Sequence, residues 1–211
     1  MLRSFGFFRF AIVLSLCLVA IAQPHAAAAQ DPAGSVRLLK AVTDRDGAAV
    51  IALLNTGSEG LINTPSRDNG ETALHIVTRR GDATWVRFLI GKGATPDVLD
   101  NAGNSPLMIA IFNDDSEIAS VLLDEGAKAD FINARGETAL IRAVQLRKPA
   151  LVRLLIAHGA NPDLADYVAG LSARDYATRD ARSTALLNAL TRRDVKSEDS
   201  LSSDSIRKPQ D

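Results

Sequence analysis

Apolar residues between positions 70 and 160 recur in two short runs every 33 residues. The first run pairs residues three apart, namely Leu74 with Val77, Leu107 with Ala110 and Leu140 with Ala143. The second run comprises Trp85, Phe88 and Leu89, then Ile118, Val121 and Leu122, then Leu151, Leu154 and Leu155. Because residues three and four apart share one face of a helix, this pattern predicts two short amphipathic helices in each unit.

Glycine and hydroxyl residues mark the ends of these predicted helices. The block Gly70-Glu71-Thr72-Ala73-Leu74 returns unchanged at 136–140, and a near copy lies at 103–107. Thr72, Ser105 and Thr138 stand where an N-cap hydroxyl is favoured, and Pro106 occupies a first-turn position. Gly93, Gly126 and Gly159 follow the second run, where a left-handed turn favours glycine. Each unit is therefore predicted to be a helix pair bounded by turns.

The regions on either side of these units are atypical, as expected for the ends of a repeat array. Upstream, 36–42 and 48–54 predict a helix pair without the glycine-threonine block. Downstream, 170–175 begins a last unit after a spacing of 34, with Arg174 in place of the core leucine, and 183–190 predicts its second helix. The expected division is an N-terminal capping repeat at 30–66, repeats at 67–99, 100–132 and 133–165, and a C-terminal capping repeat at 166–190.

Residues 1–29 predict a secretory signal peptide, with Arg3 and Arg9 ahead of an apolar stretch at 10–22 and small residues at 26–29. A retained membrane anchor is the alternative, but the apolar stretch is shorter than the roughly 20 residues that span a bilayer. Cys17 is the single cysteine and lies within that stretch, without the small preceding residue of a lipidation site. We therefore expect an exported protein without disulfides, periplasmic in the first instance and extracellular in the second.

Composition is that of an ordinary globular protein, with 46% hydrophobic and 23% charged residues and a net charge of −1. Such a charge argues against a chain whose main partner is nucleic acid. Residues 191–211 carry few large apolar side chains, and we expect a disordered tail there. A role of this tail in partner binding is an open alternative.

The repeated blocks resemble the ankyrin repeat family. Gly70-Glu71-Thr72-Ala73-Leu74-His75 is similar to the family's opening Gly-x-Thr-Pro-Leu-His, Ser105-Pro106-Leu107 matches its centre, and Gly159-Ala160-Asn161-Pro162-Asp163 resembles its closing turn. The resemblance spans about residues 35–190. It implies an all-α fold, an ankyrin-repeat solenoid of stacked helix-turn-helix units joined by hairpin-like loops.

The resemblance also implies a protein partner held on a concave face made by hairpin tips and first helices. By position, the tips are Asp68, Asn69, Glu71, Asn101, Ala102, Asn104, Ala134, Arg135 and Glu137. The helix positions are Arg79, Arg80, Phe112, Asn113, Arg142, Gln145 and Leu146, with Arg179 and Asp180 from the cap. We expect Phe112 and Leu146 to be exposed apolar contacts between polar neighbours, with Phe112 folded onto its own helix pair as the alternative. Glu71, Asn104 and Glu137 are expected to face solvent.

The sequence contains few residues that indicate an enzyme. No nucleophile elbow, phosphate-binding loop or zinc-protease motif is present, and Asp114-Asp115 fits a solvated turn better than a cation site. His75 lies where the family uses an imidazole to brace the repeat, and His158 lies at a helix C-terminus, which favours its charged form. We expect a monomeric, non-enzymatic interaction module without cofactor, metal, nucleic acid or stable membrane insertion. A secreted effector or toxin-neutralising factor is the alternative, and a hydrolase with an unrecognised site is a third possibility.

Overall fold

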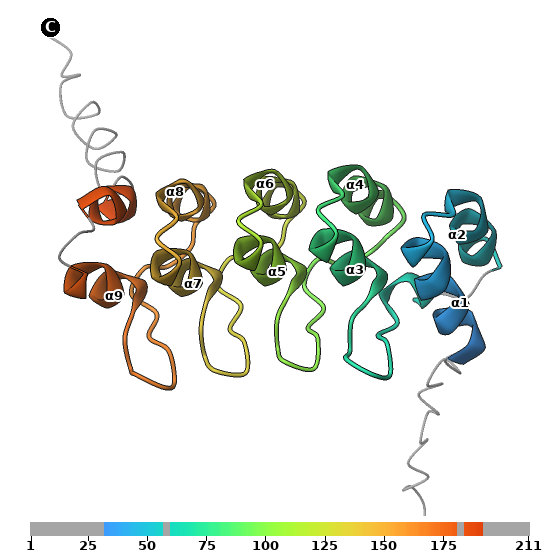
Figure 1. Ribbon diagram of the computed structural model, residues 1–211, viewed down its shortest axis with the longest axis horizontal. Coiled ribbons are helices and arrows are strands. Elements are labelled where there is room, and N and C mark those ends of the chain that lie inside the picture. The colour runs from blue at the N-terminus through green and yellow to red at the C-terminus, as the bar shows by residue number, and fades with distance from the viewer. Residues whose placement is uncertain (1–31, 57–59, 181–183, 192–211) are drawn as a thin grey trace, which may run out of the picture.

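The computed structural model describes residues 32–56, 60–180 and 184–191, and within these it consists of short helices stacked side by side. The helices lie in two rows (Figure 1). The first row contains α1 (Pro32–Thr43), α3 (Ala73–Arg79), α5 (Pro106–Phe112), α7 (Ala139–Gln145) and α9 (Ala173–Arg179). The second row contains α2 (Gly47–Leu54), α4 (Ala83–Gly91), α6 (Ser116–Asp124), α8 (Pro149–Ala157) and a helical segment at 184–191. A short 3-10 helix, η1 (Leu61–Asn63), follows α2. This arrangement confirms the predicted all-α solenoid.

Helix ends in the structure match the predicted capping signals. Thr72, Ser105 and Thr138 are the N-caps of α3, α5 and α7, and Pro106 is in the first turn of α5. The glycines at 93, 126 and 159 all have φ near +90°, which confirms the left-handed turn after the second helices. The aspartates at 46, 82 and 115 cap α2, α4 and α6, and these caps add a start signal that the hydrophobic pattern did not identify.

The core runs continuously between the two rows. Leu74, Leu107 and Leu140 are buried in the first row, as predicted. In the second row the prediction is correct for Leu89, Ile118, Val121, Leu122, Leu151 and Leu155. Leu154 of α8 is half-buried rather than buried. Trp85 and Phe88 are also half-buried, so the prediction is wrong for them. Their rings contact each other edge to face with centroids 5.4 Å apart. The position after Trp85 is occupied by a fully buried Val86, so the buried stripe of α4 is rotated by one residue from the predicted stripe.

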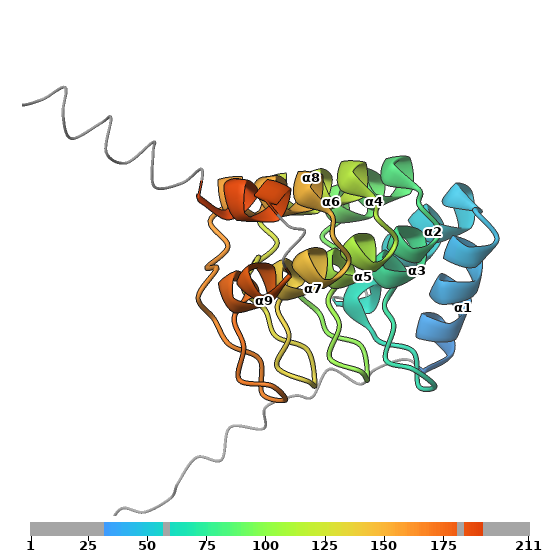
Figure 2. The same cartoon turned by 60° about the vertical axis from the view of Figure 1, so that its left-hand side comes forward.

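Four hairpin-like loops, the fingers, project to one side of the first row (Figures 1 and 2). Each closes with a backbone hydrogen bond across 66–71, 100–104, 133–137 or 166–171. Successive fingers are also joined, because the amides of Asn101, Ala134 and Tyr167 donate to carbonyls of the preceding finger. At Gly103 (φ +77°) an added Cβ would lie 2.6 Å from the Ala134 amide nitrogen. The repeated glycine is therefore required by the close approach of the next finger.

The opposite edge of the solenoid, the turn edge, carries ion pairs between neighbouring units. The turn residues at 45, 114 and 147 all have positive φ although none is glycine. Each pairs with the following unit: Arg45 with Asp82 at 3.6 Å, Asp114 with Lys148 at 2.5 Å and Arg147 with Asp180 at 2.9 Å. The prediction of a solvated turn at Asp114-Asp115 is therefore refined, since one side chain pairs across units and the other caps α6.

The predicted signal peptide at 1–29 and residues 192–211 of the predicted tail lie outside the described residues. The helix pairs expected at 36–42 and 48–54 are present within α1 and α2. In the last unit, Arg174 is half-buried and its Nε donates to Asp163 at 2.8 Å. The cation that replaces the core leucine is thus paired with a carboxylate of the preceding loop.

Candidate functional site

The fingers and the first-row helices α3, α5, α7 and α9 form one face of the solenoid, the inner face (Figure 2). The predicted tip residues that are exposed are Asp68, Asn69, Asn101, Ala102, Ala134 and Arg135. On the helices, Arg79, Asn113 and Arg179 are exposed, whereas Arg80, Phe112, Arg142, Gln145, Leu146 and Asp180 are half-buried. The residues named in this paragraph are thus at least partly open to solvent, on the fingers or on the first-row helices and their C-caps.

The expectation that Glu71, Asn104 and Glu137 face solvent is wrong. The side chains of Glu71 and Glu137 are only 12% and 11% exposed and pair with Arg79 and Arg135. Asn104 is half-buried, and its carbonyl oxygen lies 3.1 Å from His75 Nε2. These residues lie at the bases of the fingers, where neighbouring units shield them, so their first contacts are within the protein.

Phe112 and Leu146 are half-buried and pack against the core, so they are less exposed than expected. The guanidinium of Arg142 on α7 stacks over the Phe112 ring of α5, with 4.7 Å between Cζ and the ring centroid. Its NH1 donates to Gln145 at 3.0 Å, and its buried Nε has no hydrogen-bond partner among the described residues. These side chains form a half-open apolar and cationic patch at the centre of the inner face.

Two further predicted residues connect neighbouring units. Arg80 donates from NH1 to the Val42 carbonyl of α1 at 2.9 Å and pairs with Asp82 at 3.3 Å. Asn113 donates from Nδ2 to the Arg79 carbonyl at 3.2 Å. The side chain of Arg80 is committed to holding the N-terminal helix pair against α3, which leaves Arg79 as the exposed arginine of this pair.

A cleft of about 360 Å³ lies between α1, α3 and the first finger. Val36 and Leu39 of α1 and Ile76 of α3 provide its apolar side, while Arg67 and Asp68 lie at its finger side. Val36 is exposed. The sequence analysis assigned α1 to a capping repeat and did not predict that it lines a cleft. The available signal was Val36, an apolar residue among the polar positions of this end helix.

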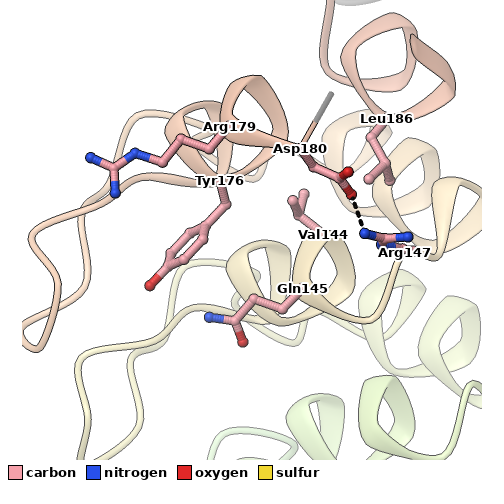
Figure 3. Close-up of a pocket in the computed structure, with 7 residues that line it drawn as sticks. All are labelled: Val144, Gln145, Arg147, Tyr176, Arg179, Asp180 and Leu186. Carbon is pink, nitrogen blue, oxygen red and sulfur yellow. Dashed lines mark ion pairs between the residues drawn. The ribbon is translucent and has the colours of Figure 1, made fainter. Parts of the chain in front are cut away.

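A second cleft, of about 410 Å³, lies at the other end, between α7, α9 and the 184–191 helix (Figure 3). Val144 and Leu186 form apolar parts of its wall, and the ion pair between Arg147 and Asp180 crosses one side. Tyr176 belongs to this lining but its hydroxyl donates to Asp166 in the last finger at 2.6 Å. A recess therefore lies at each end of the array, the second one reaching from the inner face to the turn edge, and the stacked patch lies between them.

The last finger carries the two most exposed of the large apolar side chains in the described part of the chain. Tyr167 is 72% exposed and Val168 is 78% exposed, at positions where earlier fingers have polar or small residues. Both were missed by the repeat comparison, which treated this unit only as a cap. The longer spacing of 34 before Gly170 was the available signal, because an inserted residue enlarges the fingertip.

Titratable groups near this face have structural partners. Burial is the main reason that the pKa of His75 is lowered; its Nδ1 accepts from the Thr72 amide at 3.1 Å and completes a capping box. Burial by itself would raise the pKa of Asp166, but hydrogen bonds from the Tyr176 hydroxyl and from the amides at 168–170 outweigh it and lower the pKa. These groups are used in bracing the fold, which agrees with the predicted structural role of His75.

His158, at the C-cap of α8, bonds to the Leu154 carbonyl oxygen at 2.9 Å, and this contact raises its pKa, with Asp124 contributing at 3.1 Å. The expectation of a favoured imidazolium is confirmed in direction. Within the residues described, no group of three or more His, Cys, Asp or Glu side chains is placed to hold a metal ion. The same residues contain no helix of the length and apolarity needed to span a bilayer.

Comparison with known proteins agrees with this geometry. A family model described as ankyrin repeats (3 copies) matches residues 25–131 and 79–166. A 51-residue stretch is 35% identical to the nuclear factor NF-kappa-B p110 subunit of Drosophila melanogaster, covering 24% of this chain and 5% of that protein. The match to this relative is therefore confined to a small part of it.

Proposed function

The chain belongs to the ankyrin repeat family, and from this premise we propose that it is an exported module that binds a protein partner on its inner face. Ankyrin repeats are in general protein-interaction modules without catalytic activity. The proposal adds two points to this general role: the partner binds on the inner face, and the protein acts outside the cytoplasm. It also holds that the module acts as a monomer.

The observation that carries the proposal is the stacked patch at the centre of the inner face. Phe112, Arg142 and Leu146 are half-open, so a partner can bury their remaining surface without moving the core. Aromatic and arginine side chains that lose their last contact with water are those that contribute most to protein interfaces. The clefts beside Val36 and Leu186 extend the contact surface toward both ends.

The test is capture of the native partner by the purified chain and by a Phe112→Ala variant. Phe88→Ala is the matched control, because Phe88 is also half-buried and has a lysine over its ring, but it lies on α4 in the second row. Both variants should lose less stability than the roughly 3–5 kcal/mol for a fully buried phenylalanine. If Phe112→Ala loses the partner and Phe88→Ala retains it, the result supports binding on the inner face. Equal recovery of the partner with both variants contradicts it.

Export is proposed from residues 1–29 alone, and periplasm is the proposed destination. Cell fractionation of the native host, with antibodies against the repeat array, separates periplasm, medium and cytoplasm. Recovery in the medium favours the alternative of a secreted effector or toxin-neutralising factor. Recovery of the full-length chain in the cytoplasm contradicts export.

A further inference from the structure

Ion pairs on the inner face are arranged so that the positive member meets solvent. Glu71 and Glu137 are mostly buried, whereas their partners Arg79 and Arg135 are 56% and 65% exposed at the side chain. Each carboxylate lies at the base of a finger and pairs with its arginine. The two pairs are neutral as units, yet each offers guanidinium N–H groups to an incoming molecule.

The other exposed charges on this face balance, because two arginines meet two aspartates. Arg67 and Arg179 are exposed on the same face. The exposed acids there are Asp68 and Asp175, and the carboxylate of Asp175 already accepts from the Ser172 hydroxyl at 2.7 Å and amide at 3.0 Å. With the two ion pairs included, the exposed charged side chains described on this face are four arginines and two aspartates, so an incoming molecule meets mainly guanidinium groups. Exposed guanidinium groups favour a partner that carries carboxylates.

The cationic groups are also held in place before any partner arrives. Arg79 and Arg135 are held by carboxylates, and Arg142 is stacked on Phe112 with its Nε lacking a hydrogen-bond partner among the described residues. An arginine that is already ordered loses less side-chain entropy on binding than a mobile one. Planar guanidinium groups in fixed positions suit carboxylates, which they can bind through two parallel hydrogen bonds.

Apolar side chains lie between these cations. Ile76, Phe112 and Leu146 are half-buried on α3, α5 and at the end of α7. A nucleic acid would meet them with its charged backbone, whereas a peptide can place an apolar side chain against each one. The interleaving of arginines and apolar groups therefore favours a protein segment over a polyanion.

We propose that the inner face recognises an acidic protein segment that carries large apolar side chains between its carboxylates, an inference that rests on the proposed function. Fluorescence anisotropy tests it with three labelled probes at low salt. These are a twelve-residue peptide alternating Glu with Leu, Phe and Ser, the same peptide with Lys in place of Glu, and oligothymidine of twelve nucleotides. The acidic peptide should bind about tenfold more tightly than either of the others.

Charge variants locate the binding. The inner variant carries Arg79→Gln, Arg135→Gln and Arg179→Gln, and should lose about tenfold in affinity for the acidic peptide. The outer control removes the same charge from the second row through Arg87→Gln, Lys92→Gln and Arg153→Gln, and should lose less than about twofold. Replacing the three inner arginines by lysine keeps the charge and should restore most of the binding. Circular dichroism verifies that each variant is folded.

No preference for the acidic peptide, including no binding of any probe, overturns the inference. Equal losses in the inner and outer variants also overturn it, as does tighter binding of the oligonucleotide. The proposed function is judged separately by capture of the native partner. If capture is abolished by Phe112→Ala but unchanged in the inner variant, the binding face stands and the acidic chemistry fails. If capture is unchanged in both, the proposed face itself fails.

Discussion

The contact between successive fingers predicts that replacing glycine by alanine lowers the free energy of unfolding more at Gly103 than at Gly170. Both glycines have positive φ, +77° and +65°, so alanine at either position adopts an unfavourable left-handed conformation. This conformation costs about 1–2 kcal/mol for a residue with a Cβ. At Gly170 no heavy atom lies within 4 Å of the added Cβ, and the conformational cost is the whole effect.

At Gly103 the Cβ would also lie 2.6 Å from the Ala134 nitrogen and 3.1 Å from the Asn133 carbonyl carbon. Both are backbone atoms, so the third finger must move away as a unit. That movement breaks the hydrogen bond from the Ala134 amide to the Ala102 carbonyl, which is 3.2 Å long. Losing one such bond costs about 0.5–1.5 kcal/mol. We therefore expect Gly103→Ala to lower the free energy of unfolding by about 1.5–3.5 kcal/mol.

Urea unfolding measures the difference, with far-UV circular dichroism and the fluorescence of Trp85 as two probes. Trp85 is the single tryptophan and lies in α4, in the unit that precedes the altered finger. Coinciding transitions show that the array unfolds cooperatively. The reasoning is refuted if Gly103→Ala and Gly170→Ala cost the same within about 0.5 kcal/mol, since the next finger would then exert no steric constraint.

Three other predictions concern the core, a cap and pH. Leu122→Ala removes a fully buried side chain and should cost about 2–5 kcal/mol in urea unfolding; a neutral result would contradict its burial. Ser105→Ala removes the N-cap of α5 and should cost about 1 kcal/mol in the same assay, with no loss if water replaces the hydroxyl fully. The pKa of His75 is lowered in the folded state, so the unfolded chain binds its proton first as pH falls below about 6.5, and stability should decline there. His75→Asn should reduce this decline in thermal melts between pH 7 and 5, whereas His158→Gln should steepen it, because a raised pKa stabilises the fold at low pH.

Sequence reasoning predicted the architecture well because its signals act locally. N-cap hydroxyls, first-turn proline and turn glycines determine where helices start and end within a few residues, and the 33-residue period repeats those signals in fixed phase. The error in α4 is a rotation of the buried stripe. Two large aromatic side chains at 85 and 88 resemble core residues by composition, yet a solenoid exposes the outer part of every second-row helix, where Trp85 and Phe88 contact each other.

Exposure on the inner face was less predictable, because it depends on neighbours one unit away. The spacing of Glu71 from Arg79 does not reveal that the finger shields the carboxylate and leaves the arginine outside. The stacking of Arg142 on Phe112 joins residues 30 positions apart, and no local pattern encodes it. The residues assigned to partner binding remain predictions, as does the division of the chain into repeats and caps.

The ion pairs along the turn edge make the two edges of the array respond differently to salt. Successive fingers are joined by backbone hydrogen bonds, whereas the turn edge adds ion pairs between units, such as Asp114–Lys148, to its hydrogen bonds, and the side chains of these pairs are partly open to solvent. Screening by salt appreciably weakens only the ion pairs. We therefore expect the turn edge to become more flexible than the finger edge at high salt. The radius of gyration in small-angle scattering should then change between low and molar salt. The curvature of the solenoid would then depend on ionic strength. The distance between binding positions on successive units, which a long partner must match, would change with it.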